Sequence, residues 1–555
     1  MKFSGLYRKE TQQALRSIHF DVLVIGGGIT GAGISLDAVS RGMKTALVEM
    51  QDFAAGTSSR STKLVHGGLR YLKQLEVKIV AEVGKERAIV FENGPHVTIP
   101  EWMLLPIHKG GTFGIFTTSL GLRLYDFLAK VRKSERRIML TAEETILKEP
   151  LIRKPGLKGG GYYVEYRTDD ARLTIEVIKA AFEKGAIACN YTRIIELLYK
   201  NNKICGAVAE DQTSGETYHI NAKKVVNAAG PWVDSIRLLD QSMDGKKLQL
   251  SKGVHLVLDQ SRFPLKQAVY FDTPDGRMMF AIPRDGKTYV GTTDTFYDQD
   301  IVHPIITSKD QHYIMNAIHY MFPDVNINES DIESSWAGVR PLILEDGKSP
   351  SDISRKDEIW KSDTGLITIA GGKLTGYRKM AETVVDLLAE QFNVEEGIKY
   401  PDCQTKVLPI SGGNVGGAEN FELYVGEWSS KGVKVGLTPE EAKQLTRIYG
   451  SNVEIVFNLL AQNQEDVTKY GLPSSLFAKL IYGIEEEMAV TPIDFFYRRT
   501  GALLFNIDSV KKWKNQVTAY MGMRFNWTEQ EMEKHYLELE GALRATVIPM
   551  DREDI

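Results

Sequence analysis

A glycine-rich turn near the start of the chain constrains the fold more than any other feature. The turn, Gly26-x-Gly28-x-x-Gly31, directly follows a short apolar run and directly precedes a segment of helical character. The flanking elements are predicted as a strand at residues 20–25, a helix at 32–41 and a second strand at 44–49. This order is typical of a βαβ unit, in which two parallel strands lie side by side.

The spacing of the three glycines predicts a phosphate-binding turn. Glycine permits a tight turn, a close approach of the backbone to a pyrophosphate, and close packing of the helix on the strand. The helix N-terminus then faces the anion, and Glu49 at the end of the second strand can accept hydrogen bonds from a ribose diol. A glycine-rich turn without a ligand is the alternative, but this context favours dinucleotide binding.

Later segments indicate which dinucleotide is bound. Hydroxyl-bearing residues at 57–62 follow the second strand, and His66 with a glycine pair comes next. Much later, residues 369–375 join the end of a predicted strand to the start of a helix. A helix N-terminus at that place would stabilise negative charge on a reduced flavin. The pattern therefore favours a flavin over a nicotinamide nucleotide.

The rest of the chain divides into a mixed region and a helical region. In the mixed region we predict helices at 74–95, 171–185 and 371–391, and strands within 203–229, 251–296 and 365–370. From about residue 400, helices are predicted at 438–448, 450–462, 474–487, 493–505, 508–523 and 528–544. We expect a separate helical domain there, preceded by a linker or exposed turn at 411–417.

The composition restricts the classes of function. With 555 residues, the chain is long enough for about three to four folding units. Its 68 basic and 72 acidic residues leave a formal charge of −4, which argues against a dedicated nucleic-acid-binding protein. Three cysteines without metal-ligand spacing predict neither a disulfide framework nor a metal site. We expect no signal peptide in residues 1–20 and no membrane-spanning segment.

Further motifs follow one another along the chain in the order of a known family. They lie at residues 21–33, 57–72, 169–173, 227–233, 252–255, 291–294, 338–342 and 371–378. The most specific are His-Gly-Gly-Leu-Arg-Tyr, Gly-Val-Arg-Pro-Leu and Gly-Gly-Lys-Leu-Thr. On these motifs the chain resembles the FAD-dependent, membrane-associated glycerol-3-phosphate dehydrogenases, within the D-amino-acid-oxidase-like flavoprotein superfamily.

The resemblance implies a fold class and a division into domains. It implies an α/β FAD-binding Rossmann-like domain, an interleaved α+β substrate domain with an antiparallel sheet, and an all-α C-terminal domain. The FAD-binding domain is expected at 1–90, 150–250 and 331–397, the substrate-binding domain at 91–149 and 251–330, and the C-terminal helical domain at 398–555.

The resemblance also implies a reaction and the residues that serve it. The reaction would oxidise sn-glycerol 3-phosphate to dihydroxyacetone phosphate, with hydride passing from C2 to non-covalently bound FAD. A phosphate dianion suits the forked guanidinium of arginine. The substrate-binding candidates are Arg70, Tyr71, His255, Arg340, Arg355 and Lys373. The cofactor-binding candidates are Gly26, Gly28, Gly31, Glu49, Thr57, Ser58, Ser59, Lys63, His66, Gly67, Gly68, Ala229, Gly230, Gly371, Gly372, Leu374 and Thr375.

The catalytic candidates are His255, Arg340 and Lys373, and the identity of the base among them is open. An imidazole titrates near neutral pH and suits proton abstraction from an alcohol. A guanidinium is effectively always protonated and is a poor base. We therefore favour His255 as the base, and interpret Arg340 as a charge that stabilises a phosphate or an alkoxide.

One segment, residues 109–137, is unusually basic, with seven Lys or Arg and two acidic residues. Its apolar residues recur at helical spacing on one face: Phe116, Leu120, Leu124, Phe127 and Val131. Such a helix suits the interface of a bilayer with anionic lipids; the alternative is an amphipathic helix packed on its own core. The resemblance implies a membrane quinone as acceptor and a cytoplasmic protein bound peripherally to the inner face of the cell membrane.

Other functions stay open at this point. A glycerophosphate oxidase that uses oxygen would share most of these motifs, although such oxidases tend to carry an insertion that this chain lacks. A flavin-containing binding or modification subunit is a candidate from a different class, but the clustered arginines in redox-type motifs argue against it. A homodimer is a further possibility, and we expect no nucleic-acid partner.

Overall fold

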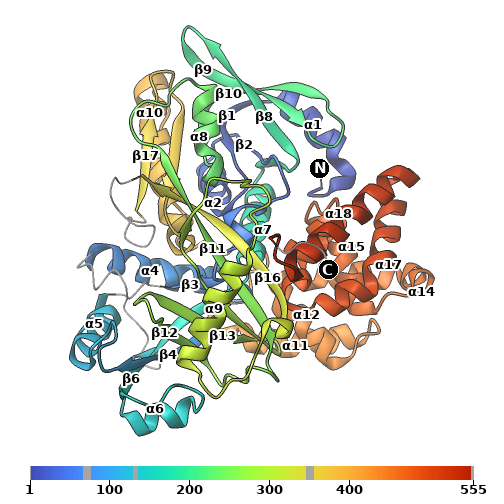
Figure 1. Cartoon of the computed structure of the whole chain (residues 1–555). Helices are drawn as coiled ribbons and strands as arrows, with labels where there is room; N and C mark the ends of the chain where they lie inside the picture. Colours follow the sequence, from blue (N-terminus) through green and yellow to red (C-terminus); the bar gives the residue numbers. More distant parts are fainter. Residues whose placement is uncertain (1, 67–76, 129–134, 345–355, 552–555) are drawn as a thin grey trace.

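Two β-sheets and a group of helices make up the molecule (Figure 1). The structure is a computed structural model that describes residues 2–66, 77–128, 135–344 and 356–551. In Figure 1 the first sheet lies in the upper part, the second sheet in the lower part, and the C-terminal helices to the right of both. The fold class predicted from the sequence is confirmed.

The first sheet contains the predicted βαβ unit. Its strand order is β17-β18-β10-β1-β2-β7, and β9 and β8 extend from β10. The bounds are β1 His19–Ile25, β2 Thr45–Val48, β7 Ile187–Cys189, β8 Thr192–Lys200, β9 Lys203–Asp211, β10 Thr217–Asn227, β17 Asp357–Lys361 and β18 Ile367–Gly371. Strand β1 runs parallel to both β2 and β10, so the carboxyl ends of these strands meet at one edge.

Helices cover both faces of this sheet, which explains why β1 is apolar from Val22 to Ile25. Val22 and Val24 share a buried cluster with residues of α2 (Ile29–Ser40), α7 (Asp170–Glu183) and α10 (Tyr377–Glu396). Leu23 and Ile25 point the other way and share a second cluster with Leu15 of α1 (Arg8–Ser17). Both faces of β1 therefore bury side chains, and its carboxyl end leads directly into the glycine turn.

The second sheet is mostly antiparallel. Its order is β15-β11-β14-β13-β12-β4-β6-β3, with β16 on β11 and β5 on β6. The bounds are β3 Leu64–Val65, β4 Thr98–His108, β5 Ile138–Leu140, β6 Leu157–Thr168, β11 Leu248–Asp259, β12 Ala268–Asp272, β13 Met278–Arg284, β14 Lys287–Gly291, β15 Thr295–Phe296 and β16 Ile332–Ile343. The associated helices are α4 Val77–Asn93, α5 Ile115–Leu128, α6 Ala142–Lys148 and α9 Ser308–Met321. The long strands β11 and β16 run between the upper and lower parts of the molecule (Figure 1).

The sheets divide the chain differently from the predicted domain boundaries. Strands β6 and β16 belong to the second sheet, whereas the boundaries at 150 and 331 assign both to the FAD-binding part. Strand β6 pairs with β4 along almost its whole length, and β16 pairs in the same way with β11. Such long-range pairing cannot be recognised from local composition, so the boundaries expected from the resemblance place these strands with their neighbours in sequence.

The C-terminal region is all-helical, as predicted. Its elements are α11 Phe421–Val433, α12 Pro439–Tyr449, α13 Val453–Gln462, α14 Gln464–Tyr470, α15 Ser474–Glu486, a π-helix Asp494–Arg499, α16 Ala502–Phe505, α17 Ile507–Phe525 and α18 Glu529–Val547. Helices α11 and α14 were not predicted. The segment predicted as one helix at 493–505 is split into the π-helix and α16.

The glycine-rich segment at 411–417 is not an exposed linker. Ser411, Gly412 and Gly413 are buried, and the Gly413 backbone lies against α4. A Cβ added at Gly413 would lie 2.1 Å from the carbonyl oxygen of Asn93. The glycines therefore serve a close approach of two backbones, which joins the helical domain firmly to the rest of the molecule.

Candidate active site

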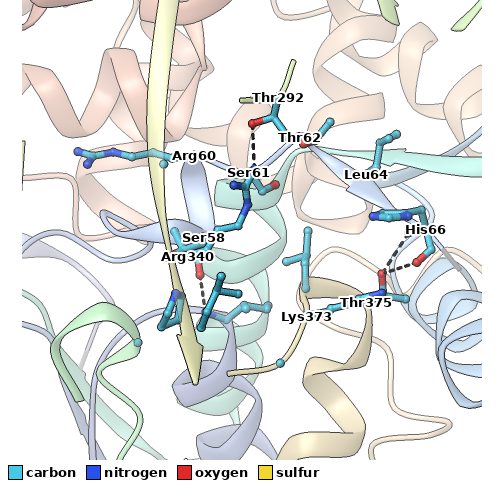
Figure 2. Close-up of a pocket in the computed structure, with 18 of the residues that line it drawn as sticks. Ser58, Arg60, Ser61, Thr62, Leu64, His66, Thr292, Arg340, Lys373 and Thr375 are labelled. Atoms are coloured by element: carbon cyan, nitrogen blue, oxygen red, sulfur yellow. Dashed lines mark hydrogen bonds between the residues drawn. The ribbon is translucent and has the colours of Figure 1, made fainter. Parts of the chain in front are cut away.

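A cavity of about 630 Å³ lies where the two sheets meet. Its wall is formed by the turns after β1 and β2, by strands β11 and β16 of the second sheet, and by the turn after β18. Figure 2 shows side chains from these separate segments converging, among them Ser58, Arg340, Lys373 and Thr375. The cavity has one end made of glycine turns and another end made of charged and aromatic side chains.

The glycine end is built by the predicted turn and Glu49. Gly26 has a φ of +118°, and a Cβ there would lie 2.5 Å from the carbonyl oxygen of Ala228, so only glycine fits. Gly28 is the N-cap of α2, and the Ile29 N–H donates to the Ser58 hydroxyl. The Gly27 N–H donates to the Glu49 carboxylate at 2.7 Å. Burial raises the pKa of that carboxyl, and the backbone donors partly oppose the rise.

A second turn, residues 371–375, closes the same cavity from the end of β18. Gly371 and Gly372 have φ values of +76° and +85°, which glycine adopts without strain. The Thr375 hydroxyl accepts from the His66 N–H at 3.1 Å and donates to the His66 carbonyl at 3.2 Å (Figure 2). These bonds join the turn to the segment after β2, so residues far apart in the sequence form one wall.

His255 occupies the charged end, on β11. Its cross-strand neighbours are Gly291 on β14 and Trp336 on β16. The imidazole stacks on the Trp336 ring at 4.6 Å with an interplanar angle of 9°. On its other side, a Cβ added at Gly291 would lie 2.1 Å from the imidazole, so the absent side chain makes the room. Pairing across three strands therefore fixes the position of this ring.

The hydrogen bonds and charges around His255 keep it neutral. Its Nε2 lies 3.0 Å from the Thr62 hydroxyl, and its Nδ1 has no hydrogen-bond partner among the described residues. Burial lowers the pKa of the imidazole well below 6.5, and the positive charges of Arg340 and Lys63 lower it further. A neutral imidazole at neutral pH is able to accept a proton.

Arg340, on β16, is held by a fixed set of partners. Its guanidinium donates to the Thr292 hydroxyl at 2.9 Å (Figure 2) and to the Asp294 carboxylate at 3.2 Å. It lies across Gly253, where a Cβ would be 2.2 Å from one of its nitrogen atoms. The guanidinium is thus oriented before any ligand enters, and it lines the cavity beside His255.

The structure brings most of the predicted site residues into this one cavity. Those in its lining are Gly26, Gly28, Glu49, Thr57, Ser58, His66, Ala229, Gly230, His255, Arg340, Gly371, Gly372, Lys373, Leu374 and Thr375. Gly67, Gly68, Arg70, Tyr71 and Arg355 fall outside the described residues.

Three predicted cofactor residues are placed behind the lining instead. Gly31 packs α2 on the turn, since a Cβ there would lie 1.9 Å from the Gly26 carbonyl oxygen. The Lys63 ammonium is buried against the Asp170 carboxylate at 2.6 Å. Ser59 is buried, and its carbonyl accepts from Lys63 at 2.9 Å. These residues support the wall of the cavity and do not form its surface.

Four residues of the charged end were not among the site residues predicted from the sequence. They are Thr62, Thr292, Asp294 and Trp336, of which the first three line the cavity and the last stacks on His255. Thr292 and Asp294 lie inside the motif at 291–294, so the motif itself was the available signal. The role of Trp336 comes from its register opposite His255, which no local pattern reveals.

Comparisons with known proteins agree with this geometry. Residues 21–378 match the family described as FAD dependent oxidoreductase, and residues 403–532 match the C-terminal domain of alpha-glycerophosphate oxidase. The chain is 60% identical over 551 residues to the aerobic glycerol-3-phosphate dehydrogenase of Bacillus subtilis (strain 168), covering 99% of each chain. It is 58% identical over 545 residues to the protein of the same name from Staphylococcus haemolyticus (strain JCSC1435), covering 98% of each.

Comparison with solved structures agrees with these sequence matches. The glycerol-3-phosphate dehydrogenase from Bacillus halodurans, complexed with FAD, has a TM-score of 0.87 at 51% identity over 100% of both chains. The L-alpha-glycerophosphate oxidase from Mycoplasma pneumoniae shares the fold, with a TM-score of 0.56 at 19% identity over 70% of this chain and 97% of that one. The chain therefore belongs to the FAD dependent oxidoreductase family, and FAD is its cofactor.

The residues present fit that cofactor. A cavity of about 630 Å³ is within the range of small-molecule and cofactor sites, about 300–1,000 Å³. Gly26 and Gly28 leave the turn ahead of α2 without side chains beside the cavity, and Glu49 presents a buried carboxylate there. The opposite wall offers a second glycine turn ahead of α10. A dinucleotide with an aromatic ring system matches both ends of this arrangement.

Proposed function

We propose that this chain oxidises sn-glycerol 3-phosphate to dihydroxyacetone phosphate as an FAD-dependent dehydrogenase. The observation that carries the proposal is the pairing of a buried neutral imidazole with a clamped guanidinium in the cavity of the glycine turns. The names of the full-length relatives support the choice of substrate. The class of reaction follows from the cofactor, which accepts the hydride from C2 when it is bound.

The residues divide into those that hold FAD and those that handle the substrate. The start of α2 at Gly28 would hold the pyrophosphate, Glu49 a ribose, and the turn at 371–375 the flavin ring. Arg340 at the charged end and Lys373 in the turn at 371–375 place positive charge in the cavity, where a phosphate dianion or a developing alkoxide would be stabilised. Arg70, Tyr71 and Arg355 remain candidates from the sequence for the same phosphate.

His255 takes the proton in this proposal. When the C2–H bond breaks, the hydrogen leaves with both electrons, and the C2 hydroxyl proton must go to a base. The imidazole is neutral because burial and two nearby cations lower its pKa. The Thr62 hydroxyl, 3.0 Å from Nε2, orients the ring.

An anaerobic titration of the holoprotein with sn-glycerol 3-phosphate tests the proposal. We expect the flavin absorbance band to bleach near stoichiometry, because hydride transfer reduces the flavin. Glycerol without the phosphate should bleach it far more weakly at the same concentration, since the cationic groups then have no dianion to bind. A flavin that stays oxidised with excess sn-glycerol 3-phosphate would contradict the proposal.

We further propose that a membrane quinone is the electron acceptor and that α5 rests on the inner face of the cell membrane. Phe116 and Leu120 are 79% and 59% exposed on α5, while α5 packs inward through Thr118 and Leu122 against Gly161. At Phe116 and Leu120 the predicted apolar face is thus turned outward and is not used for core packing, while Leu124 of the same face is half-buried. In the described part of the chain no helix is long and apolar enough to cross a bilayer.

Neighbouring elements carry further exposed apolar side chains. Ile138 on β5 and Leu147 on α6 are 48% and 77% exposed, and both elements adjoin β6, as α5 does. Helices α5 and α6 lie at the same end of the molecule, the lower one in Figure 1. The basic residues Lys130, Arg132 and Lys133 of the predicted segment lie outside the described residues.

Co-sedimentation with vesicles of anionic phospholipid tests this surface. Phe116→Ser combined with Leu120→Ser should move the protein to the supernatant, because the change removes the apolar side chains that would enter the bilayer interface. Leu423→Ser is the matched control, since Leu423 is 71% exposed on α11 of the helical domain. Equal sedimentation of the double variant and the control would eliminate α5 as the anchor.

Oxygen is the alternative acceptor, because the helical domain matches a domain named for an oxidase. Peroxide release during turnover without an added acceptor distinguishes the two. We expect slow peroxide release and fast reduction of an added quinone analogue; fast peroxide release would overturn the quinone proposal.

A further inference from the structure

The C-terminal helical domain contacts Trp336, the residue that stacks on the imidazole of His255. Phe505, in α16, has its ring 5.8 Å from the Trp336 ring at 66°, an edge-to-face contact. Trp336 in turn stacks on His255. Phe505 also contacts Tyr289, on the neighbouring strand β14, at 5.7 Å and 69°. A continuous row of rings therefore leads from the C-terminal domain to His255.

Two hydrogen bonds from the residues just before Trp336 also join β16 to the helical domain. The Ser334 hydroxyl donates to the carbonyl of Leu504, and the Ser335 hydroxyl donates to the carbonyl of Thr546 at 2.8 Å. Trp336 itself is 2% exposed and donates from its indole nitrogen to the Ser61 carbonyl at 3.2 Å. The helical domain is thus bonded to the residues of β16 next to the tryptophan that supports the imidazole.

We propose that the C-terminal domain is a positioning element of the active site, and that Phe505 acts through Trp336 to hold the His255 ring. Edge-to-face and stacked rings at these separations attract one another and restrict rotation. Without the Phe505 ring, one side of Trp336 faces a void, so the indole and the imidazole gain freedom. This inference rests on the proposed role of His255 as the base.

Loss of the ring would also change the surroundings of the imidazole. The charged groups that face His255 are Arg340 from β16 and Lys63 from the loop before β3, and both stay in place in a Phe505 variant. The guanidinium of Arg284 lies 4.4 Å from the Phe505 ring and 3.5 Å from the Asp169 carboxylate. A void at Phe505 admits water next to Trp336, and weaker desolvation raises the pKa of His255 toward 6.5.

The test compares Phe505→Ala with Phe525→Ala in the full-length holoprotein. Phe525 is the matched control, because its ring is half-buried in the same domain and lies 5.8 Å from that of Trp527. For each variant, FAD content, thermal midpoint and the rate of flavin reduction by sn-glycerol 3-phosphate are measured across pH. Phe505→Tyr keeps the ring and should restore the wild-type rate and pH profile.

We expect both alanine variants to lose similar thermal stability and to keep FAD. Only Phe505→Ala should slow flavin reduction, by about 10-fold at saturating substrate, and shift the acid limb of the rate profile to higher pH. If Phe505→Ala yields no FAD-bound protein, Phe505→Leu gives the same comparison, because it keeps the volume and removes the ring.

The outcomes separate this inference from the proposed function. Equal reduction rates and equal pH profiles in the two phenylalanine variants would overturn the inference. Failure of the wild-type flavin to bleach would instead overturn the proposed function. An unaffected rate of flavin reduction in His255→Asn would overturn the assignment of His255 as the general base, on which this inference rests.

Discussion

The two ends of the cavity are built in opposite ways. At the glycine end, the bond from Gly27 to Glu49 joins residues 22 apart in the chain. At the charged end, the contact of His255 with Thr62 joins residues 193 apart. The first is made within one βαβ unit, whereas the second requires three paired strands of the second sheet to be in register.

This difference has a physical consequence. The turn at the glycine end is set mainly by backbone conformation within one βαβ unit, and Ala228 after β10 is the distant residue that packs against it. The charged end depends on strand pairing, and its rings and charges are held by neighbours from distant segments. Substitutions at the glycine end should therefore abolish FAD binding. Substitutions at the charged end should instead slow substrate oxidation and leave FAD bound.

The largest effect is expected from Gly26→Ala. The added Cβ would lie 2.5 Å from the Ala228 carbonyl oxygen at a φ of +118°, so the turn must open, and we expect purified protein without FAD. Gly42→Ala is the control: its φ is +94°, but nothing lies within 4 Å of the new Cβ. The control should cost only about 1–2 kcal/mol and keep FAD. The absorbance ratio of flavin to protein is the measurement, and full FAD content in Gly26→Ala would contradict the role of this turn in binding FAD.

Arg499→Met tests whether the glycine end is purely local. Asp52, in the turn after β2, is fully buried and accepts from Arg499 at 2.7 Å. Removing the arginine takes away one of the two guanidinium groups that pair with the buried carboxylate, since Arg498 still donates to Asp52 at 2.5 Å. The free energy of unfolding should therefore fall by about 1–3 kcal/mol. Arg447→Met removes an exposed pair with Glu422 and should cost about 0–1 kcal/mol. Chemical denaturation measures both; equal losses would show that the Asp52 contact contributes little.

Arg340→Lys tests the charged end. A lysine keeps the positive charge but cannot span Thr292 and Asp294 with a planar fork, so kcat/KM for sn-glycerol 3-phosphate should fall about 10²-fold, or roughly 2.7 kcal/mol. FAD content should be unchanged. Arg262→Lys, at a half-exposed pair with Asp331, serves as the control and should keep wild-type kcat/KM. Loss of FAD from Arg340→Lys would show that the two ends are not separable.

The smallest effect is the position of the acid limb in wild-type protein. The imidazole of His255 must be neutral to accept a proton, and activity falls as pH drops through its pKa. Because burial lowers that pKa, the acid limb of kcat/KM should lie below pH 6.5. A limb at or above pH 6.5 that disappears in His255→Asn would show that the imidazole is solvated in solution.

The sequence predicted the glycine end in more detail than the charged end. The βαβ unit, the turn and Glu49 were predicted correctly because they follow from the spacing and the types of neighbouring residues. His255 and Arg340 were placed by motif, but Trp336 and Thr62 were missed because their contact with the imidazole comes from register and loop packing. For the same reason, the predicted domain boundaries place the residues of β6 and β16 in the FAD-binding domain, although both strands pair in the second sheet. Local backbone conformation can be predicted from residues that are neighbours in the sequence, whereas cross-strand pairing cannot.

The central claim is that His255 performs the proton transfer at an end of the cavity separate from the cofactor turn. Stopped-flow reduction of His255→Asn by sn-glycerol 3-phosphate at neutral pH tests it most directly. The account predicts full FAD content with flavin reduction slowed by about 10²-fold or more, the usual contribution of a general base. Reduction at the wild-type rate with FAD bound would contradict it.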